Sequence, residues 1–536
     1  MVRSRAARQE SLLPPRVEDY VEPDNPVRAI EGYVCALDLA KLGFRHAKRR
    51  GSGAGQPPYD PADLLKLYLY GYLNQIRSSR RLERESSRNL ELIWLLKNLR
   101  PGYRTIANFR KENWAALKAA NRSFVLLLKE IGLISGSVVA VDGALFHGNA
   151  SKGSIFTQNK LTKQIAELDK EIEAYGKALE ANDAAEAKQR SSDGSDSGSG
   201  GGDVGEKMKL LMARRERAKA DLEELKTSDK GQISKTDPNA RLLSKGDQTI
   251  AGYNVQSVVD DKHMLIIASE VVNRSDAGQL HKMAKAAKEA LGVKTLQILA
   301  DAGYFNSEDV KACEDDGVTA YVPVHEGNDK LKNQGRFTRK DFTYDARSNT
   351  YCCPAKQLLR PTKTPVKNVS GRIETRYLGS KATCGACSLQ ASCLGPKAKY
   401  RTVFRWEHEI VLDRLRQRMA SEDAGKLMRR RSAIVEHPFG TLKCRAGYRH
   451  FLVRGFDKVG GEWSLMALSY NFARVINILG FNGFLARIAE WALATLRATS
   501  REGRSAWTLI LLPLTRFRAK ISLSLEVAPR RAHPAL

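Results

Sequence analysis

Hydrophobic and aromatic residues recur at helical spacing in the first quarter of the chain. Residues 1–25 are basic and punctuated by proline, and we expect them to be irregular. From Asp60-Pro61 onwards, a pair typical of a helix N-cap and first turn, leucine and tyrosine residues follow at helical intervals. Further apolar segments of this kind continue to Ile134. The pattern predicts an all-α domain over residues 26–135.

Short β-type runs then replace the helical pattern. The run SVVAVD has β-branched and small apolar residues that end on Asp142, and Gly143 beside it leaves room for a close approach. Strand-like patterns return in TIAGYNVQSVVD and HMLIIASEVV, residues 249–260 and 263–272. We predict a β-hairpin there, with its turn at residues 260–262.

A helical insertion separates the first of these runs from the others. Residues 157–228 hold two segments whose apolar residues keep heptad spacing, interrupted at Arg215. Between them, residues 191–203 have the Gly, Ser and Asp composition of a flexible linker. We predict an antiparallel coiled-coil hairpin that projects from the core.

One more helix and strand complete the core pattern. Residues 275–292 fit a helix with Ser275 as its cap and Gly292 as its stop, and VKTLQILA then forms a strand that ends just before Asp301. Three strands, a helix and a strand, with an aspartate ending the first and last strands, are the order of a ribonuclease-H-like mixed sheet. In that α/β fold the first and fourth strands are neighbours. We assign the core to residues 136–480.

A third acidic residue lies in SAIVEHPFGTLK, a basic segment compatible with a helix. Glu436 and Lys443 are two helical turns apart, so a continuous helix would put both on one face. Pro438 removes a backbone donor, and we expect it to kink or limit the helix. Residues 462–479 are apolar at helical spacing and are expected to pack on the sheet. Residues 481–536 form a basic tail to which we assign no role.

Five of the eight cysteines gather in a second insertion, at about residues 325–410. They are too few and too local for a general disulfide framework. A Cys-x-x-Cys pair with further cysteines on either side offers four thiolates at a spacing plausible for tetrahedral Zn²⁺. The zinc ligands that we predict are Cys353, Cys384, Cys387 and Cys393. Cys352 competes for the first position, and reduced thiols without metal are the alternative.

The chain is strongly basic, with a formal net charge of +28 and a pI near 9.7. Such a field suits a phosphate-rich partner, and we expect double-stranded DNA. Basic side chains of the N-terminal helices are candidate phosphate contacts, although a solvated charged face is the alternative for any one of them. These candidates are Arg77, Arg80, Arg81, Arg84, Arg104, Arg110 and Lys111. The predicted hairpin would then serve self-association or reach along DNA, unless it is a passive insertion.

No segment predicts attachment to a membrane. The first ten residues, MVRSRAARQE, lack the pattern of a secretory signal. The longest apolar run, residues 506–514, is too short to span a bilayer and contains Pro513. We therefore expect a soluble, cytoplasmic protein associated with the nucleoid, with no membrane partner and no small-molecule substrate.

Asp142, Asp301 and Glu436 are candidate metal ligands for phosphodiester chemistry. Cleavage without a covalent protein intermediate requires activation of a water or a 3′ hydroxyl and stabilisation of the departing oxyanion. Two Mg²⁺ ions held by a few carboxylates do both. Thiolates suit Zn²⁺ instead, so the carboxylates and the cysteines predict two chemically separate sites.

Taken in order, these motifs give the chain a resemblance to the DDE-class insertion-sequence transposases of bacteria. The segment YDPADLLKLYLYGYLNQIRSSRRLE, followed by RTIANFR, resembles their N-terminal domain. VDGALFHGNASK, SKTDPNARLLSKG, AGYNVQSVVD, LADAGYF, the YCCPA and CGAC cysteines and VEHPFGTLK resemble their DDE domain. The resemblance covers nearly the full chain.

The resemblance implies a metal-binding triad of Asp142, Asp301 and Glu436 in a homodimer that works on paired transposon ends. It implies hydrolytic nicking that frees a 3′ hydroxyl, followed by strand transfer into target DNA. The family's Tyr-Arg-Glu-Lys signature is partly present, because Ser432 stands at its arginine position. The candidate DNA contacts in this region are Lys443 in register, Arg431 one residue early, Arg429 at the tyrosine position, and Arg445.

Two other functions are compatible with these residues. A metal-dependent nuclease on the same core would cleave DNA without joining it. A domesticated DNA-binding protein would be catalytically silent, although three intact carboxylates argue against it. His147 and His437 lie near the carboxylates in sequence, and we interpret both as structural rather than metal-binding. Asp237, in SKTDPNAR, is a reserve carboxylate or a turn residue.

Overall fold

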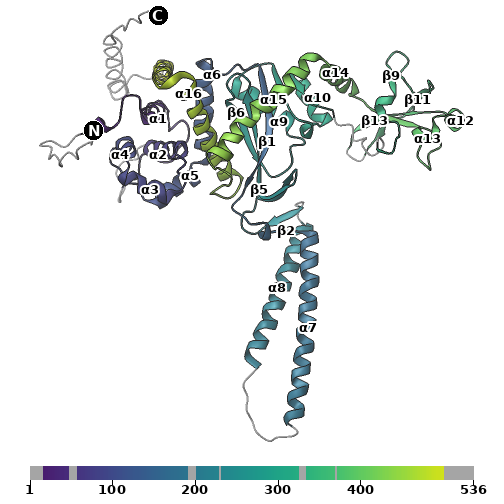
Figure 1. Cartoon of the computed structure of the whole chain (residues 1–536), viewed down its shortest axis with the longest axis horizontal. Coiled ribbons are helices and arrows are strands. Elements are labelled where there is room, and N and C mark those ends of the chain that lie inside the picture. The colour runs from purple at the N-terminus through teal and green to yellow at the C-terminus, as the bar shows by residue number, and fades with distance from the viewer. Residues whose placement is uncertain are drawn as a thin grey trace, which may run out of the picture.

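The structure is a computed structural model of the whole chain (Figure 1). It describes all residues except 1–15, 48–56, 191–200, 228–230, 325–332, 369–370 and 500–536. Most of the predicted linker, residues 191–200, and most of the predicted basic tail lie outside the described residues.

Helices fill the N-terminal part of the chain, as the apolar spacing predicts. After a 3₁₀ turn at Val17–Tyr20, they are α1 (Pro26–Cys35), α2 (Pro61–Leu73), α3 (Ser79–Arg88), α4 (Leu90–Leu95), α5 (Tyr103–Glu112) and α6 (Trp114–Glu130). The Asp60 carboxylate caps α2 by accepting a hydrogen bond of 2.8 Å from the amide of Ala62. Asn113 divides the last apolar segment into α5 and α6.

A six-stranded mixed sheet forms the centre of the molecule. Its strands are β1 (Val138–His147), β4 (Arg241–Lys245), β5 (Gln248–Asp260), β6 (Ile266–Val272), β7 (Leu296–Leu299) and β8 (Val318–Tyr321). The order is β4-β5-β1-β7-β8, and β6 also pairs with β5. β1 is antiparallel to β5 and parallel to β7, which is the neighbour relation expected for the two strands that lead to aspartates. The predicted β5–β6 hairpin is present.

Five further helices support this sheet: α9 (Leu280–Leu291), α10 (Ser307–Asp315), α14 (Glu409–Met419), α15 (Glu422–Gly440) and α16 (Phe456–Thr499). α15 contacts β1, β5 and β7, while α16 packs against β6 and the N-terminal α6. The side-chain amide of Asn471 in α16 pairs with both backbone groups of Ile266 in β6. One continuous hydrophobic core therefore joins the N-terminal helices to the sheet.

Arg110 is part of this junction and does not face solvent, which corrects our prediction that it contacts DNA. Only 6% of its surface is exposed, and its guanidinium lies 3.3 Å from the fully buried carboxylate of Glu462 in α16. Arg77 approaches the same carboxylate at 3.9 Å and donates a hydrogen bond to the carbonyl of His450. A buried charge requires such a partner, so these arginines hold α16 against α2 and α5.

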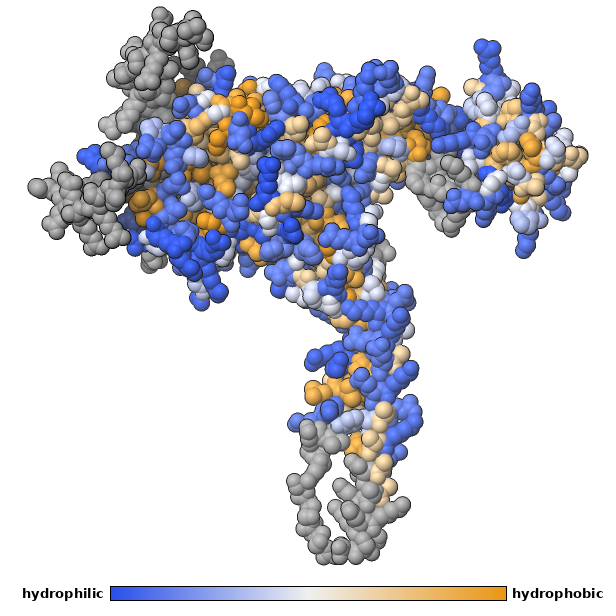
Figure 2. Space-filling view, viewed as in Figure 1, coloured by the Kyte–Doolittle hydropathy of each residue, from blue (hydrophilic) through white to orange (hydrophobic). Residues whose placement is uncertain are grey.

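The first insertion is a long helical hairpin that projects from the sheet (Figure 1). It consists of α7 (Gln158–Arg190) and α8 (Gly201–Thr227), with the short β2 (Ile155–Thr157) and β3 (Gln232–Ser234) paired at its base. Arg215, which interrupts the heptad pattern, forms an ion pair with Asp169 of the facing helix. Figure 2 shows hydrophobic areas on the otherwise hydrophilic hairpin. Two large residues of α8, Leu210 and Met212, are 63% and 49% exposed.

The second insertion is a small separate sheet at the end of the molecule opposite the N-terminal helices (Figure 1). Its strands are β9 (Thr343–Asp345), β10 (Thr350–Cys352), β11 (Leu358–Pro361), β12 (Val366–Lys367), β13 (Ile373–Leu378) and β14 (Thr402–Trp406). The short helices α12 (Lys381–Gly385) and α13 (Gln390–Cys393) carry Cys384 and Cys393, and Cys387 lies between them. Only five buried hydrophobic residues form the core of this unit, a small number for independent stability.

Three element boundaries differ from the sequence-based predictions. α9 begins at Leu280, so Ser275 is not its cap, whereas Gly292 ends it in the left-handed conformation as predicted. α15 continues through Pro438 and passes into a π-helical turn, Thr441–Arg445, so the proline does not limit it. α16 extends beyond residue 480, with a non-helical Gly480 inside it.

α16 contains a segment, Phe456–Ala494, that is long and apolar enough to cross a membrane by length and composition. Its first half is buried in the core: Trp463 and Phe472 are fully enclosed by neighbouring elements. A core helix of this kind has the same composition as a membrane span.

Candidate active site

The register of β1 and β7 brings Asp142 and Asp301 to matching positions. The two strands are parallel, with Ala140 opposite Leu299. Asp142 and Asp301 each follow two residues later. Since neighbouring strands lie roughly 4.8 Å apart, the two aspartates lie side by side at the end of the strand pair. Asp301 also caps a 3₁₀ turn by accepting a hydrogen bond of 2.9 Å from the amide of Gly303.

Asp142 is a largely buried carboxylate with a cation beside it. Its side chain is 19% exposed, and its Oδ1 lies 3.1 Å from the Nζ of Lys245. Burial raises the pKa of Asp142 above its ordinary value, Lys245 opposes that shift, and the negative charge of Asp301 adds to it. The strand pair therefore concentrates negative charge in a partly desolvated position.

A network of buried polar side chains lies behind Asp142. The Oδ1 of Asp276 accepts hydrogen bonds from Asn254 at 2.8 Å and from Gln256 at 2.7 Å. Tyr304, in the turn that follows Asp301, donates to the side-chain oxygen of Gln256. The polar residues of β5 thus face a closed network rather than solvent. β5 is an inner strand of the sheet and pairs with β1, β4 and β6.

Gly143 makes this network possible. A Cβ atom at Gly143 would lie 2.1 Å from the Oδ1 of Asp276 and 2.4 Å from the Nε2 of Gln256. No side chain fits into that space. The glycine that follows Asp142 in sequence therefore lets the polar network pack directly against β1.

Glu436 lies on α15, the helix that crosses β1, β5 and β7. Its neighbours Ile434 and Val435 are buried against the core, while Glu436 itself is exposed. Among the described residues, no group of three or more His, Cys, Asp or Glu side chains has the arrangement needed to hold a metal ion. The structure thus brings two of the three predicted carboxylates together and leaves Glu436 outside that pair.

Two cations predicted near Glu436 lie close to the aspartates. The Nζ of Lys443 sits 4.7 Å from the centre of the Phe146 ring, and burial together with Lys245 lowers the pKa of Lys443. Asp142 raises it. The Nη1 of Arg431 is buried without a hydrogen-bond partner, and the charge of Arg431 acts on the pKa of Tyr304. Lys443 therefore lies near Asp142, and Arg431 lies near Tyr304, in the turn after Asp301.

The other predicted DNA contacts lie on surfaces. Arg429 and Arg445 are exposed on α15 and on the turn after it, and Arg80 and Arg81 are exposed on α3. Arg80 stacks 5.3 Å from the ring centre of Tyr103 and helps to line an open hollow with Arg84 and Arg100. These positions are accessible to a phosphate backbone.

His437 and Asp237 make hydrogen bonds that stabilise the fold. The Nδ1 of His437 lies 2.8 Å from the hydroxyl of Tyr470, in agreement with its structural interpretation. Asp237 is fully buried and accepts hydrogen bonds from the hydroxyl of Tyr253 at 2.7 Å and from the amide of Gly455 at 3.1 Å. Asp237 therefore ties a loop to β5 and is not the reserve ligand at the carboxylate pair.

The four predicted zinc ligands line one small cavity, although in the structure their thiols do not have the arrangement of a metal site. Cys353, Cys384, Cys387 and Cys393 line a space of about 30 Å³ together with Arg401. The thiols are near enough that the other three raise the pKa of Cys393, in addition to burial. The Sγ of Cys353 accepts a hydrogen bond of 3.3 Å from the amide of Gln357. Cys352 does not line the cavity.

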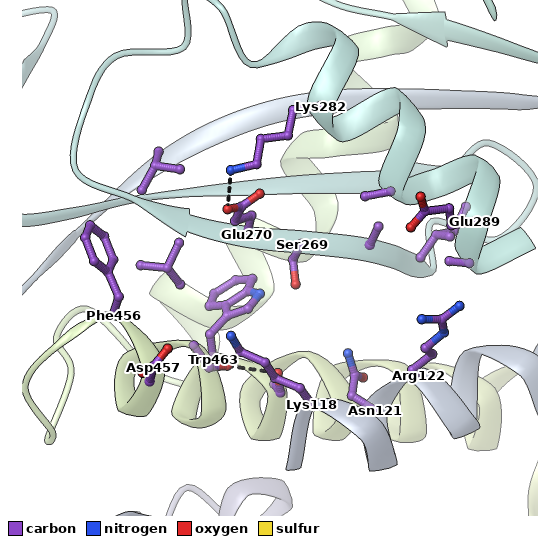
Figure 3. Close-up of a pocket in the computed structure, with 18 of the residues that line it drawn as sticks. Lys118, Asn121, Arg122, Ser269, Glu270, Lys282, Glu289, Phe456, Asp457 and Trp463 are labelled. Carbon is purple, nitrogen blue, oxygen red and sulfur yellow. Dashed lines mark hydrogen bonds and ion pairs between the residues drawn. The ribbon is translucent and has the colours of Figure 1, made fainter. Parts of the chain in front are cut away.

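A further cavity lies elsewhere and is lined by residues of β6 (Figure 3). It has a volume of about 670 Å³ and lies between α6 and α16 on one side and β6 and α9 on the other. Trp463 and Asn121 bring buried polar atoms to it that have no hydrogen-bond partner. Neither aspartate of the strand pair lines this cavity, so it is separate from the carboxylate site.

The sequence pattern did not single out Lys245 or Asp276 as site residues. Lys245 ends β4, and Asp276 lies in the loop between β6 and α9. One signal was available: Asn254 and Gln256 are amide side chains that alternate with apolar residues along β5. Buried polar groups require partners, but the sequence does not say which.

Comparison with known proteins gives the following matches. A transposase domain (DUF772) matches residues 15–112, and a transposase DDE domain matches residues 352–476, a range that includes Glu436. Among solved structures, the chain is similar to a cryo-EM structure of the piggyBac transposase synaptic complex with hairpin DNA. The identity is 9% and the TM-score 0.30, over 96% of this chain and 87% of that chain. No curated protein matches the chain.

Both domain models describe transposase domains, and they match in the order that the sequence motifs predict. The chain thus carries two segments that match transposase domains, one of them a transposase DDE domain, and these matches support its resemblance to the DDE-class insertion-sequence transposases.

Proposed function

We propose that the protein binds the ends of its insertion sequence and catalyses Mg²⁺-dependent cleavage and strand transfer through Asp142, Asp301 and Glu436. The observation that carries this proposal is the register of β1 and β7, which sets Asp142 beside Asp301 at the end of a parallel strand pair. α15 crosses the same strands and carries Glu436. The strand order and this helix support a ribonuclease-H-like core.

The donor chemistry of the aspartate pair fits magnesium. Asp142 and Asp301 offer carboxylate oxygens, the ligands that Mg²⁺ prefers. Bound there, Mg²⁺ would activate the attacking oxygen and stabilise the departing one. Glu436, on the helix that packs against the same strands, would be the third ligand. Arg431 and Lys443 supply donors for the phosphate that is cleaved.

DNA is the partner that the charge distribution favours. Exposed arginines on α3, including Arg80 and Arg81, and exposed Arg429 and Arg445 near α15 are the proposed phosphate contacts. The protein acts as a homodimer on paired ends in the cytoplasm, where chromosomal DNA is available. The helical hairpin is proposed to form a coiled coil that supports self-association, because Leu210 and Met212 are exposed on α8.

Cleavage and joining assays test the proposal directly. Purified full-length protein is incubated with a labelled DNA fragment that carries the element's ends, with Mg²⁺ and with EDTA. We expect Mg²⁺-dependent nicks at the ends and joined products with target DNA, at least about 100-fold reduced in D142N and D301N. D315N, which changes an exposed aspartate of α10, is the matched control and should retain wild-type activity.

The two alternatives give different results in the same assays. A nuclease would release ends but yield no joined product from pre-nicked ends and target DNA. A silent DNA-binding protein would bind the ends and cleave nothing with either Mg²⁺ or Mn²⁺. Either result would contradict the proposed transposition activity.

We also propose a structural Zn²⁺ in the small cysteine-bearing sheet. Four thiols share one cavity, and the unit has a hydrophobic core of only five buried residues, a size at which a metal commonly supplies stability. Metal analysis of the purified protein should give about one zinc per chain. C387S should lose it and C444S, an exposed cysteine outside the cavity, should retain it. Less than about half an equivalent in the wild type would contradict the proposal.

A further inference from the structure

The ammonium group of Lys245 occupies a position at the carboxylate site that a metal would contest. Its Nζ lies 3.1 Å from the Oδ1 of Asp142, 2.6 Å from the carbonyl of Gly143 and 3.3 Å from the Oδ2 of Asp276. All three partners are oxygens, so Lys245 has the surroundings of a bound cation. It reaches the site from the end of β4, on the far side of β5 from β1.

Asp276 is held in place independently of Lys245. Its Oδ1 accepts two hydrogen bonds from side-chain amides of β5, which leaves Oδ2 for the ammonium. Asn254 and Gln256, which donate these bonds, are almost completely buried. Asp276 therefore remains a fixed acceptor whether or not Lys245 also contacts Asp142.

The position of Lys245 affects the electrostatic repulsion between the two aspartates. Asp142 and Asp301 are two neighbouring carboxylates, and one of them is 19% exposed, so their mutual repulsion is weakly screened without a counter-ion. Lys245 reduces that repulsion in the metal-free protein. A divalent cation that binds the Oδ1 of Asp142 would lie close to the ammonium of Lys245. Because the two positive charges repel, the cation must compete with the ammonium for that oxygen.

We propose that Lys245 is the internal counter-ion of the catalytic carboxylates. Divalent metal displaces its ammonium from Asp142, and Asp276 retains the displaced ammonium beside the site. Lys245 is a positioning residue in this scheme: it keeps the carboxylates preformed before metal binds and lowers the affinity for metal. The inference rests on the proposed function, because it takes Asp142 to be a metal ligand.

Direct measurement of metal binding tests it without an activity assay. Mn²⁺ is titrated into metal-free full-length protein without DNA, and free Mn²⁺ is measured by electron paramagnetic resonance. K245M removes the charge but keeps much of the apolar length, and we expect it to bind Mn²⁺ about fivefold more tightly at the carboxylate site. K245R keeps the charge and should bind as the wild type does.

The chain offers a matched control in Lys282. Its side chain is 49% exposed, against 44% for Lys245, and it pairs with Glu270 at the edge of the same sheet, outside the carboxylate site. K282M should leave Mn²⁺ affinity unchanged. D142N should abolish the site, and if it does not, the proposed function itself is wrong.

Thermal unfolding gives a second readout. K245M should lower the Tm in EDTA, because two carboxylates lose their counter-ion, and Mn²⁺ should raise the Tm of K245M by more than that of the wild type. Mn²⁺ affinity that is unchanged or weaker in folded K245M, while D142N still abolishes binding, would overturn the counter-ion proposal and leave the proposed function intact.

Discussion

Asp142, the proposed catalytic carboxylate, is held in the folded protein at a cost to stability. It is mostly buried beside another carboxylate, and burial raises its pKa although Lys245 opposes the shift. A carboxylate whose charged form is disfavoured in the folded state lowers stability at any pH at which it is ionised. The neighbouring Gly143 adds a second constraint, because only a glycine leaves room for Asp276 and Gln256. Packing therefore requires Gly143, whereas packing alone does not account for a destabilising carboxylate at Asp142.

D142N is therefore expected to raise the Tm at neutral pH. The direction of this change in stability follows from the raised pKa of Asp142. Below pH 3.8, the unfolded pKa, Asp142 is protonated in both the folded and the unfolded state and costs no stability. As the pH rises through the folded pKa, Asp142 ionises in the folded state as well and lowers the free energy of unfolding. The Tm of D142N should exceed that of the wild type most at pH 7, and the difference should shrink toward zero near pH 4. Calorimetry across this range, in EDTA, measures it. A gain that grows as the pH falls would contradict the assignment.

At the scale of elements, close backbone approaches decide how α16 packs. Gly461 lies against α6, where a Cβ atom would be 2.7 Å from the Cα of Trp114. The two helices could not keep their present separation with any larger residue. Asn471, two to three turns further along α16, fastens the same helix to β6. α16 is thus fixed on both sides, to the N-terminal helices and to the sheet.

G461A is expected to destabilise the protein by about 1–3 kcal/mol, because the added methyl group forces α16 away from α6. Urea unfolding followed by circular dichroism measures the change. Gly483 lies on the same helix in an exposed position, and a Cβ there meets only Leu479 at 3.5 Å. G483A should be neutral or stabilising by up to about 1 kcal/mol. Equal effects of the two substitutions would contradict the packing argument.

At the scale of the whole molecule, basic residues divide into two groups. Arg77 and Arg110 are buried and neutralise Glu462, so they join the N-terminal helices to α16. Arg80 and Arg81 are exposed on the neighbouring α3 and are free to contact phosphates. Burial thus divides one predicted cluster of arginines into those that stabilise the fold and those that remain candidates for DNA contact.

R80A/R81A is expected to weaken DNA binding regardless of the DNA sequence. The slope of log association constant against log salt concentration should decrease in magnitude by about 2, one unit for each lost phosphate contact. Fluorescence anisotropy between about 50 and 200 mM salt measures both. The thermal stability of the double variant should stay at the wild-type value.

R110M is the contrasting change. It should lower stability by about 3 kcal/mol, because Glu462 loses a buried partner. The salt slope of whatever folded protein remains should be unchanged, as measured at a temperature well below the Tm. A reduced slope in R110M would mean that Arg110 reaches DNA after all.

Local sequence by itself determined the elements and the identity of the main candidates. Heptad spacing predicts the helical hairpin, Asp60 caps its helix, Gly292 ends another, and apolar runs end at Asp142 and Asp301. Each of these depends on residues close in sequence, where spacing and side-chain type are sufficient. The four cysteines that share a cavity were also identifiable, because thiols at Cys-x-x-Cys spacing are rare outside such clusters.

Tertiary structure decided which residues meet. Strand register sets Asp142 beside Asp301, burial turns Arg110 from a candidate DNA contact into a partner of Glu462, and packing against neighbours carries α15 through Pro438. Lys245 and Asp276 come from separate loops and strand ends, so no local pattern connects them to Asp142. Such contacts depend on the register and burial of residues far apart in sequence, which residue type and spacing along the chain do not specify.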